Sequence, residues 1–563
     1  MKKGTFLLVL HSHLPYCRRA GRWPHGEEWL YEAATETYIP LLNALYDLAE
    51  EGLPVKATIG ITPVLAEQLA DSLILEHLEE YIHDKISRAE KDAVRFGLAE
   101  QSDYAGLAGW YQRWYQRLWE SYAGRFNRDI IGAFRKLQEK GHVEILTSAA
   151  THGYLPLMER DSSIYGQLRV GVDSYKRHFG RAPRGIWLPE CAYRPAYYRD
   201  EGGRSYLKPG SEQFLAELGI GAFFAETHTV EGGMPVGKAM GDAIGPYGGP
   251  PKRRVVPLPS YTEPKERTTF QPYYVQGTDV AVFGRDNRTG QQVWSATFGY
   301  PGDYDYREFH KKDDVSGIQY WRVTAARSDL SQKQPYNPEW AEGRRKEHAQ
   351  HFSRVVEEHL EGYFNSAGRP GVVTAAYDAE LFGHWWFEGV DWIKDVLRNL
   401  SRSSVVELST ASDYLEKHPP EDVLALPESS WGLGGHHFTW MNDNTNWMWE
   451  PIHRAEYRVE ALAARYPKAE GSLKEILNQA ARELLLLQSS DWPFLVTTGQ
   501  AKEYAIGRFQ EHVGRFEALA GIAEKGTVSP EDLEFCKELW EVDKLFPNID
   551  YRVFAEREKQ TGL

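Results

Sequence analysis

Short runs of apolar and β-branched residues recur along most of the chain, and helical patterns separate several of them. A short apolar run bounded by turn residues is typical of a buried strand, and apolar residues spaced three and four apart are typical of a helix packed on a core. The predicted strands are 4–10, 55–61, 143–147, 185–188, 221–224, 372–376 and 405–408. The helical patterns between them include 38–51, 165–178, 211–218 and 392–400. This alternation predicts a parallel sheet in the form of a closed or nearly closed barrel.

Two long segments interrupt the alternation. Residues 63–124 are helical and charged, then aromatic, which predicts a helical insertion between the second and third strands. Residues 227–337 are rich in glycine, proline and tyrosine and contain further short strand patterns at 255–257 and 279–283. Loops of this length in a compact domain are either functional or disordered, and the aromatic content favours a lid insertion over a cleft.

The pattern changes after about residue 412. A loop with many tryptophans and glycines is followed by helical periodicity at 452–465, 472–488, 500–525 and 530–540. A run of helices without strands is typical of a helical bundle. We therefore predict an α/β protein in which a barrel over 1–412 carries both insertions. An all-α C-terminal domain over 413–563 contributes to the cleft.

Composition narrows the classes of partner. The formal net charge of −15 argues against nucleic acid or an anionic membrane, because binding to either needs clustered lysine and arginine. Three widely spaced cysteines, Cys17, Cys191 and Cys536, do not make a disulfide framework or a cysteine-rich zinc site. The 18 tryptophans and 32 tyrosines are typical of sugar-binding sites, and equally of a large core with many aromatic rings.

The hydropathy of the chain predicts a soluble protein. The apolar run at 5–10 follows two lysines but ends in His-Ser-His instead of a signal-peptide cleavage site. The other apolar stretches are shorter than the roughly 20 residues that a membrane span needs. With the cysteine pattern, this indicates a cytoplasmic protein.

An acid ends each of two predicted strands. Glu190 follows the apolar run in Gly-Ile-Trp-Leu-Pro-Glu, and Asp378 ends Gly-Val-Val-Thr-Ala-Ala-Tyr-Asp. Each acid alone could be a solvated surface charge. Both, however, lie at the carboxyl ends of barrel strands, where the chemistry of barrels takes place. Two carboxyl groups are the minimum that glycoside cleavage requires, so the pair suggests sugar chemistry.

Four histidines also follow predicted strands. His11 and His13 are at positions i and i+2, so both side chains can point to the same face. They could hold zinc, bind sugar hydroxyls or serve in packing; the strand supplies no aspartate to complete a metal site, and we favour binding to substrate. His152 and His384 are either solvated loop residues or part of the cleft lining.

Several segments resemble the sequence motifs of glycoside hydrolase family 57. The five motif-like segments are His-Ser-His-Leu-Pro-Tyr at 11–16, Glu-Ile-Leu-Thr-Ser-Ala-Ala-Thr-His at 144–152, Trp-Leu-Pro-Glu-Cys-Ala-Tyr at 187–193, Tyr-Asp-Ala-Glu-Leu-Phe-Gly-His-Trp-Trp at 377–386, and 431–440. Gln-Val-Trp-Ser at 292–295 and Ser-Asp-Trp-Pro-Phe at 490–494 are similar to the branching-type members, the α-1,4-glucan branching enzymes. The resemblance covers nearly the whole chain.

The resemblance implies an incomplete (β/α)7 TIM-like barrel and a retaining double displacement on an α-glucan. It gives Glu190 the role of nucleophile and Asp378 that of general acid and base, with no metal and no cofactor. Aromatic residues where the family has its cleft aromatics, and therefore expected to bind substrate, are Trp23, Trp294, Trp431 and Trp440. Asp491 resembles a cleft residue contributed by the helical domain, and Tyr247 is the candidate for the family's tyrosine on a flexible loop.

Other functions remain open at the level of sequence. An α-amylase-like hydrolase or a 4-α-glucanotransferase would use the same carboxyl groups. The loop with Trp431 and Trp440 could be a packing seam between barrel and bundle instead of a sugar-binding wall. A metal-dependent deacetylase or mannosidase is supported by His11 and His13 alone. A glycan-binding protein without catalytic activity would not need both acids. The sequence leaves open whether the chain is a monomer or a dimer.

Overall fold

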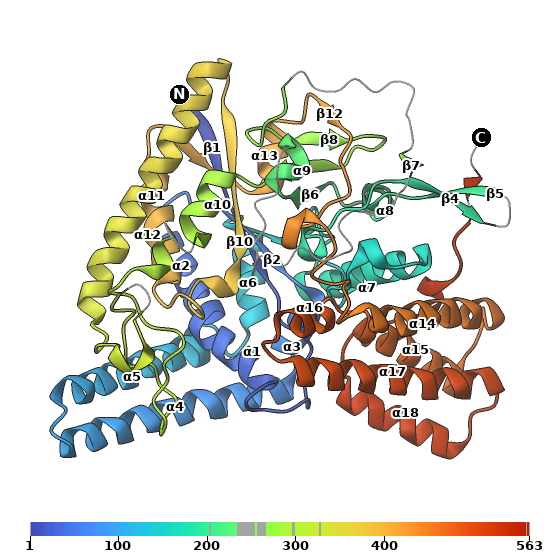
Figure 1. The fold of residues 1–563 in the computed structure, drawn as a ribbon, viewed down its shortest axis with the longest axis horizontal. Helices are drawn as coiled ribbons and strands as arrows, with labels where there is room; N and C mark the ends of the chain where they lie inside the picture. Colours follow the sequence, from blue (N-terminus) through green and yellow to red (C-terminus); the bar gives the residue numbers. More distant parts are fainter. Residues whose placement is uncertain are drawn as a thin grey trace.

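In the computed structural model, strand β1 (Gly4–Ser12) starts beside the N-terminus and runs into the interior (Figure 1). All of its residues are buried, as expected for an apolar strand covered on both faces. It pairs in parallel with β10 (Gly371–Asp378) along its whole length and with β2 (Ala57–Ile61) near its end, and β2 pairs with β3 (Val143–Leu146). The structure describes residues 2–201, 204–232, 254–255, 266–295, 299–325, 328–558 and 560–561.

Further parallel segments continue this sheet into a ring. In order, the links are the bridge Thr147–Ile186, the bridge Gly185–Ala222, the pairing of β6 (Ala222–Ala225) with β9 (Ala281–Gly284), and the hydrogen bond from Asp286 N to Thr374 O of β10 (2.9 Å). The segments β1, β2, β3, 185–188, β6, β9 and β10 therefore follow one another around a TIM-like barrel, as predicted.

The prediction was wrong about the seventh strand. It took 405–408 as a barrel strand and placed 279–283 in an insertion. In the structure β9 completes the ring. Strand β11 (Val406–Leu408) instead pairs in parallel with the first three residues of β1, and β2 pairs with residues nearer the end of β1. Both segments are short apolar runs, and the choice between them depends on non-local pairing that periodicity does not show.

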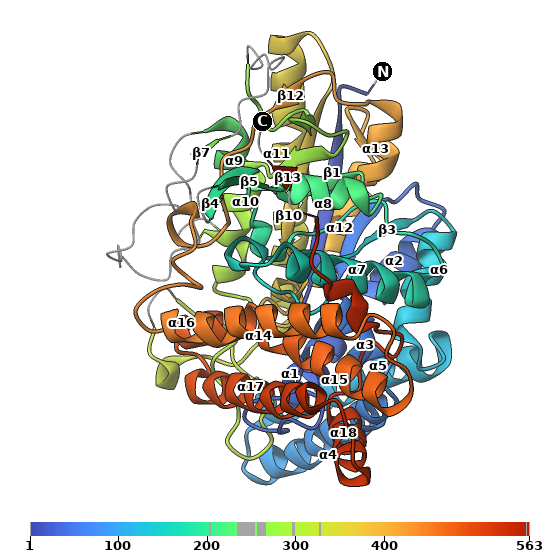
Figure 2. The ribbon, with the colours of Figure 1, turned by 90° about the vertical axis from the view of Figure 1, so that its right-hand side faces the viewer.

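Helices cover the outside of the ring on both sides (Figures 1 and 2). The helices at the predicted positions are α2 (Ile39–Glu50), α7 (Asp161–Phe179), α8 (Ser211–Glu217) and α12 (Gly389–Ser401). Two more, α6 (Ile130–Glu139) and the long α11 (Pro338–Ala367), pack beside them. One large apolar cluster joins the inner faces of several of these helices to β1, β2 and β10.

The helical insertion consists of α3 (Pro63–Leu69), α4 (Ser72–Leu98) and α5 (Ser102–Glu120). Helices α4 and α5 form a hairpin that extends away from the barrel (Figure 1). The hairpin contacts the second long segment: Tyr111 OH donates to Gln319 O (2.7 Å), and Arg95 pairs with Asp313 (2.8 Å). The two interruptions of the strand and helix alternation are therefore packed on each other.

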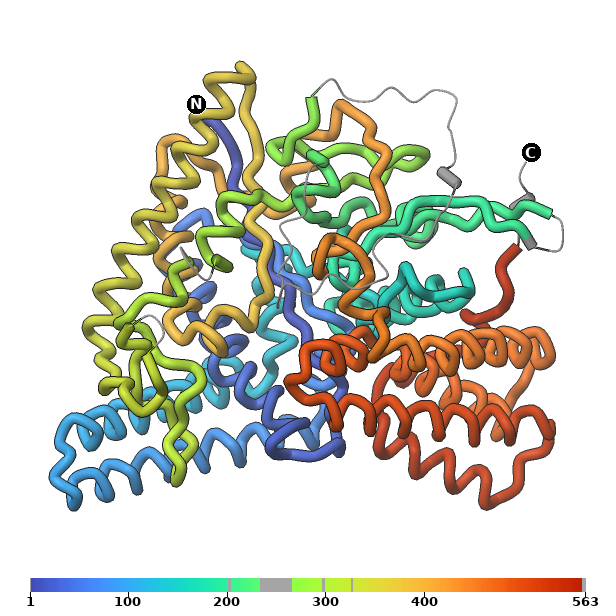
Figure 3. The backbone as a smooth tube through the Cα atoms, in the orientation of Figure 1, coloured from blue at the N-terminus to red at the C-terminus, as the bar shows by residue number. Residues whose placement is uncertain are grey.

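The C-terminal part is helical, as predicted. It contains α14 (Asn446–Arg465), α15 (Gly471–Leu487), α16 (Asp491–Thr498), α17 (Lys502–Lys525) and α18 (Pro530–Val542). Figure 3 shows these helices stacked beside the barrel half of the chain. Within the ranges that the structure describes, no helix has both the length and the apolar character of a membrane span.

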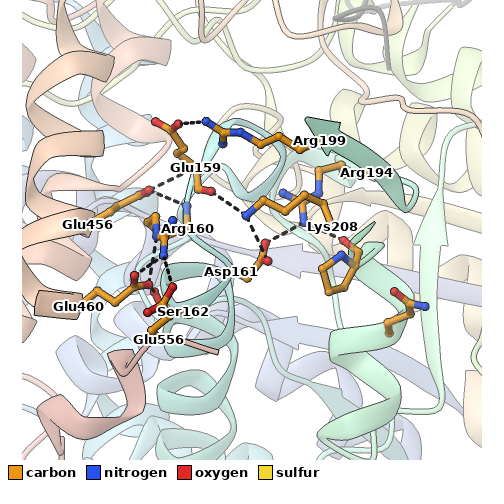
Figure 4. Close-up of polar contacts among 12 residues, drawn as sticks. Glu159, Arg160, Asp161, Ser162, Arg194, Arg199, Lys208, Glu456, Glu460 and Glu556 are labelled. Carbon is orange, nitrogen blue, oxygen red and sulfur yellow. Dashed lines mark hydrogen bonds and ion pairs between the residues drawn. The ribbon is translucent and has the colours of Figure 1, made fainter. Parts of the chain in front are cut away.

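Charged side chains join the helical part to the barrel (Figure 4). Arg160, just before α7, pairs through Nε with Glu460 of α14 (3.1 Å), and its Nη2 lies 3.3 Å from Glu556. The backbone N–H groups of Glu159 and Arg160 donate to Glu456 of α14 (2.9 and 3.0 Å). The junction is therefore built from paired and mostly buried charges.

Candidate active site

Glu190 lies on a turn directly after barrel segment 185–188. Its φ is 62° and its ψ is 25°, and Cys191 follows with a φ of 49°. Left-handed residues with side chains cost about 1–3 kcal/mol each, so their surroundings must hold them. Cys191 N donates to Leu188 O (2.9 Å), and Trp431 N donates to Glu190 O (3.0 Å). These contacts fix the direction of the Glu190 side chain.

The Glu190 carboxyl group is held from two sides. Trp431 Nε1 donates to Oε2 (2.7 Å), and Ser490 Oγ donates to Oε1 (3.3 Å). The side chain is 14% exposed. Burial raises the pKa of Glu190 to about 7, with the nearby Asp378 also raising it and the Trp431 hydrogen bond opposing the shift. A carboxyl group with this pKa changes charge near neutral pH.

A chain of hydrogen bonds leads from β1 to this carboxyl group. His11 Nε2 lies 3.1 Å from His152 Nε2, and His152 Nδ1 lies 2.9 Å from Ser490 Oγ. Because Ser490 donates to Glu190, we assign the proton of His152 to Nδ1, and His152 Nε2 then accepts from His11. The pKa of His152 is well below its usual value because the ring is buried and because His13 and His11 lie near it. This ring therefore stays neutral.

His13 connects the barrel to the helical domain. Its Nε2 lies 3.0 Å from Asp491 Oδ1, and its Nδ1 lies 3.1 Å from Thr62 Oγ1. Its ring stacks on that of His152 at 3.9 Å between centroids. Burial alone would lower the pKa of His13, but Asp491, then Glu190 and Glu380, raise it. His11, His13, His152 and Asp491, predicted separately from the sequence, are therefore brought together.

Asp378 ends β10 and stands opposite His11 in the strand register. Its charge raises the pKa values of both Glu190 and Glu380. Glu380 accepts hydrogen bonds from His13 N (3.1 Å) and from Tyr38 OH, and burial raises its pKa to about 8. The two predicted catalytic acids thus share one electrostatic environment.

His384 lies in the loop that follows β10. Its backbone N–H donates to Thr37 Oγ1 (3.2 Å), and its Nδ1 lies 3.5 Å from Glu36. Glu36 also pairs with Arg307 (2.9 Å). Burial alone would raise the pKa of Glu36, but Arg307 and His384 lower this pKa to about 2. His384 therefore belongs to an ion-pair network that supports the loop after β10.

The predicted aromatic residues differ in exposure. Trp431 is 8% exposed and donates to Glu190, so it belongs to the site. Trp440 is 1% exposed and stacks on Tyr154 (4.2 Å), which places it behind the site as packing. Trp294, at the end of α10 (Asn287–Trp294), is partly buried, whereas Trp23 is 78% exposed. Tyr247 lies outside the described residues.

Among the described residues, one group of potential metal ligands has its donor atoms within 4.8 Å of one another: Glu483, His512 and Asp543 in the helical domain. His512 Nδ1 lies 2.8 Å from Glu483, while its Nε2 lies 3.0 Å from Arg508 Nη2. A metal on Nδ1 would leave the proton on Nε2, facing an arginine N–H. The group therefore suits an ion-pair network better than a metal centre.

Sequence reasoning missed three residues of the site, Ser489, Ser490 and Glu380. Ser490 contacts both Glu190 and His152, and Ser489 donates to Asp491 (2.5 Å). Serine carries no strong signal by itself; the signal was its position next to Asp491. Glu380 lay inside a recognised motif but was not assigned a role, because a second acid two residues after Asp378 reads as a surface charge.

The model of glycosyl hydrolase family 57 matches residues 7–427. The chain belongs to this family. A second model, the C-terminal domain of 1,4-alpha-glucan branching enzymes, matches residues 451–554. Together, the two models cover the barrel and helices α14 to α18 of this family 57 protein.

Known family 57 proteins are similar over nearly the whole chain. A 1,4-alpha-glucan branching enzyme of Thermococcus kodakarensis is 43% identical over 97% of this chain and 77% of its own length. The crystal structure of a family 57 branching enzyme from that organism has a TM-score of 0.90 at 42% identity, covering 99% of this chain and 98% of the other. An α-amylase from Thermotoga maritima has a TM-score of 0.81 at 30% identity, covering 99% and 100%.

Proposed function

We propose that the chain is a 1,4-α-glucan branching enzyme, a glycosyltransferase that cleaves an α-1,4 glucan and transfers the released chain to a 6-hydroxyl of another glucan. The observation that carries this proposal is the match to the C-terminal domain of branching enzymes in the same part of the chain that supplies Ser490 and Asp491 to the site. Named relatives at 43% identity support it. Its partner is therefore an α-glucan.

In the first step, the ionised Glu190 attacks the anomeric carbon, and Asp378 gives its proton to the departing glycosidic oxygen. This forms a covalent glycosyl-enzyme and releases the first chain. The hydrogen bonds from Trp431 and Ser490 hold the two oxygens of Glu190, so the carboxylate is oriented before substrate arrives. No cofactor is needed for either bond change.

In the second step, Asp378 takes the proton of the acceptor 6-hydroxyl, whose oxygen attacks the anomeric carbon and displaces Glu190. Two displacements at one carbon retain its configuration. Water in place of the hydroxyl gives hydrolysis. The similarity to an α-amylase keeps a retaining hydrolase as the second candidate, since that enzyme would use the same two acids.

The distinguishing experiment follows three products made from amylose: loss of iodine staining, new reducing ends, and side chains released by a debranching enzyme. Branching predicts loss of staining with few reducing ends and many new side chains. Hydrolysis predicts reducing ends that rise in step with the lost staining and no side chains.

The roles of the acids are tested by Glu190→Gln and Asp378→Asn. Each should lower turnover by at least about a thousandfold, because covalent and acid catalysis are lost. The matched control is Glu347→Gln on the exposed side of α11, where Glu347 pairs with Arg344 (2.9 Å), and it should behave as the parent enzyme. Near-normal turnover in Glu190→Gln would show that the nucleophile is another group.

A further inference from the structure

Exposure separates the tryptophans that can stack on a sugar from those that support the site. Stacking requires an open ring face, and three tryptophans around Glu190 have little or none: Trp187 is 0% exposed, Trp440 1% and Trp431 8%. Trp385 is 45% exposed, although it belongs to the loop that follows Asp378. This loop therefore presents an open aromatic ring seven residues after Asp378.

The loop holds Trp385 in this exposed place by its backbone. Residues 382 and 386 form a bridge, and Gly383 N donates to Trp386 O (2.7 Å). Trp385 N donates to Glu380 O (3.2 Å), which ties it to the residue that binds His13. Because Trp386 is 1% exposed and Trp385 is 45% exposed, successive side chains point into the core and out of it.

Among the residues that the structure describes, one aromatic ring lies edge-on to Trp385. The centroid of Trp385 lies 6.4 Å from that of Trp294, with 74° between the planes. The edge-on contact orients Trp385. The two residues follow β10 and β9, which are neighbours in the ring, so both belong to segments on the side of the barrel where Asp378 ends its strand.

The residues that contact Glu190 come from outside the Asp378 sector, by which we mean β9, β10 and the segments that directly follow them. Trp431 belongs to the loop before α14, Ser490 precedes α16, and Glu190 itself follows segment 185–188, which is separated from β10 by β6 and β9. In a double displacement, the general acid protonates the leaving chain and later deprotonates the acceptor. The leaving chain and the acceptor therefore occupy the Asp378 sector, where Trp385 lies.

We propose that Trp385 is a platform on which the acceptor glucan stacks, and that it selects a sugar hydroxyl over water as the group that resolves the glycosyl-enzyme. The proposal rests on the proposed function, because it uses Asp378 as the acid and base. The ring adds no chemical step. It raises the fraction of glycosyl-enzyme that has an acceptor chain in place when Asp378 removes the proton.

The test compares Trp385→Ala and Trp385→Phe with the parent enzyme on amylose, by counting new side chains and new reducing ends. Loss of one stacking ring should lower the number of branches per reducing end by about tenfold, equivalent to about 1.4 kcal/mol, while cleavage continues. Trp385→Phe keeps a ring and should recover most of the branching. Trp340→Ala is the matched control, since Trp340 on α11 is 56% exposed and faces Arg322 instead.

The outcomes separate this proposal from the proposed function. An unchanged ratio of branches to reducing ends in Trp385→Ala overturns the platform and leaves the branching activity standing. If the parent enzyme makes no branches, the branching function fails, and the KM for amylose hydrolysis then decides the platform. A KM about tenfold higher in Trp385→Ala, with kcat retained, supports stacking on the leaving chain, and an unchanged KM rejects it.

Discussion

At the scale of single residues, environment gives neighbouring acids different charges. Burial raises the pKa of Glu190 to about 7 and that of Glu380 to about 8, whereas Arg307 and His384 overcome burial and lower the pKa of Glu36 to about 2. Groups with strongly shifted pKa values concentrate at functional sites. The hydrogen-bond donors on Glu190 favour its ionised form, which is the form that the proposed mechanism requires.

Trp431→Phe tests the effect of one such donor. Below pH 7 the Glu190 carboxyl group of the free enzyme is neutral, so kcat/KM should fall as the pH is lowered through about 7. The substitution removes the N–H donor to Oε2, raises the pKa of Glu190 and should move this acidic limb upward by about one pH unit. The pH profile of kcat/KM for amylose measures the shift. An acidic limb that stays in place would mean that Trp431 does not tune Glu190.

Ser490→Ala removes a positioning residue that touches both Glu190 and His152. We expect kcat to fall by about tenfold with little change in KM, because the nucleophile loses its orientation while the residues of the Asp378 sector remain. The acidic limb should also move upward, since a donor to the carboxylate is lost. Ser490→Thr retains the hydroxyl and should restore both values. A merely structural role would lower stability without moving the pH profile.

At the scale of elements, the loop after β10 depends on one glycine. Gly383 has a φ of 101°, and a Cβ built on it would lie 1.8 Å from Glu36 O. Only a residue without a side chain can pass this point, since the conformation and the space both exclude one. The same turn carries His384 and Trp385, so a packing constraint and the presentation of a ring are combined in one element.

Gly383→Ala should lower the free energy of unfolding by about 3 kcal/mol or more, because strain at positive φ adds to a backbone clash. Gly362→Ala, inside α11 and five residues before its end, is the matched control. A Cβ there meets nothing within 4 Å, so the change should stabilise the protein by about 0.5–1 kcal/mol. Denaturant unfolding of both variants measures the difference. Equal stabilities would show that the 383–386 turn can rearrange at little cost.

The elements show what the sequence could and could not predict. Strand-ending acids and histidines placed Glu190, Asp378, His11, His13 and His152 at one edge of a parallel barrel, because strand ends converge whatever the loops do. The sequence did not show that β9, and not β11, completes the ring, because both are short apolar runs that differ only in the strands with which they pair. Ser490 was missed because its partners Glu190 and His152 are about 300 residues away in the chain.

At the scale of the whole molecule, the helical domain supplies residues to the candidate active site. A chain of polar contacts runs from the junction toward Glu190: Gln488 Nε2 donates to Glu456 (3.1 Å), and Gln167 Nε2 donates to both Gln488 (3.1 Å) and Thr151 (2.9 Å). Thr151 precedes His152, and Gln488 directly follows α15, two residues before Ser490. Docking of the two parts and orientation of Glu190 are therefore coupled through the same segments.

Arg160→Ala tests this coupling at the junction itself. The change would leave the mostly buried Glu460 carboxylate without its arginine, and breaking a buried pair costs about 3–5 kcal/mol. Arg169→Ala on α7 is the matched control: Arg169 pairs with Asp173, both side chains are at least 40% exposed, and its loss should cost less than about 0.5 kcal/mol. Because Ser490 reaches Glu190 from the helical domain, Arg160→Ala should also lower kcat at temperatures where the fold persists. A variant that unfolds earlier but keeps the kcat of the parent enzyme would show that the junction stabilises the fold without positioning the site.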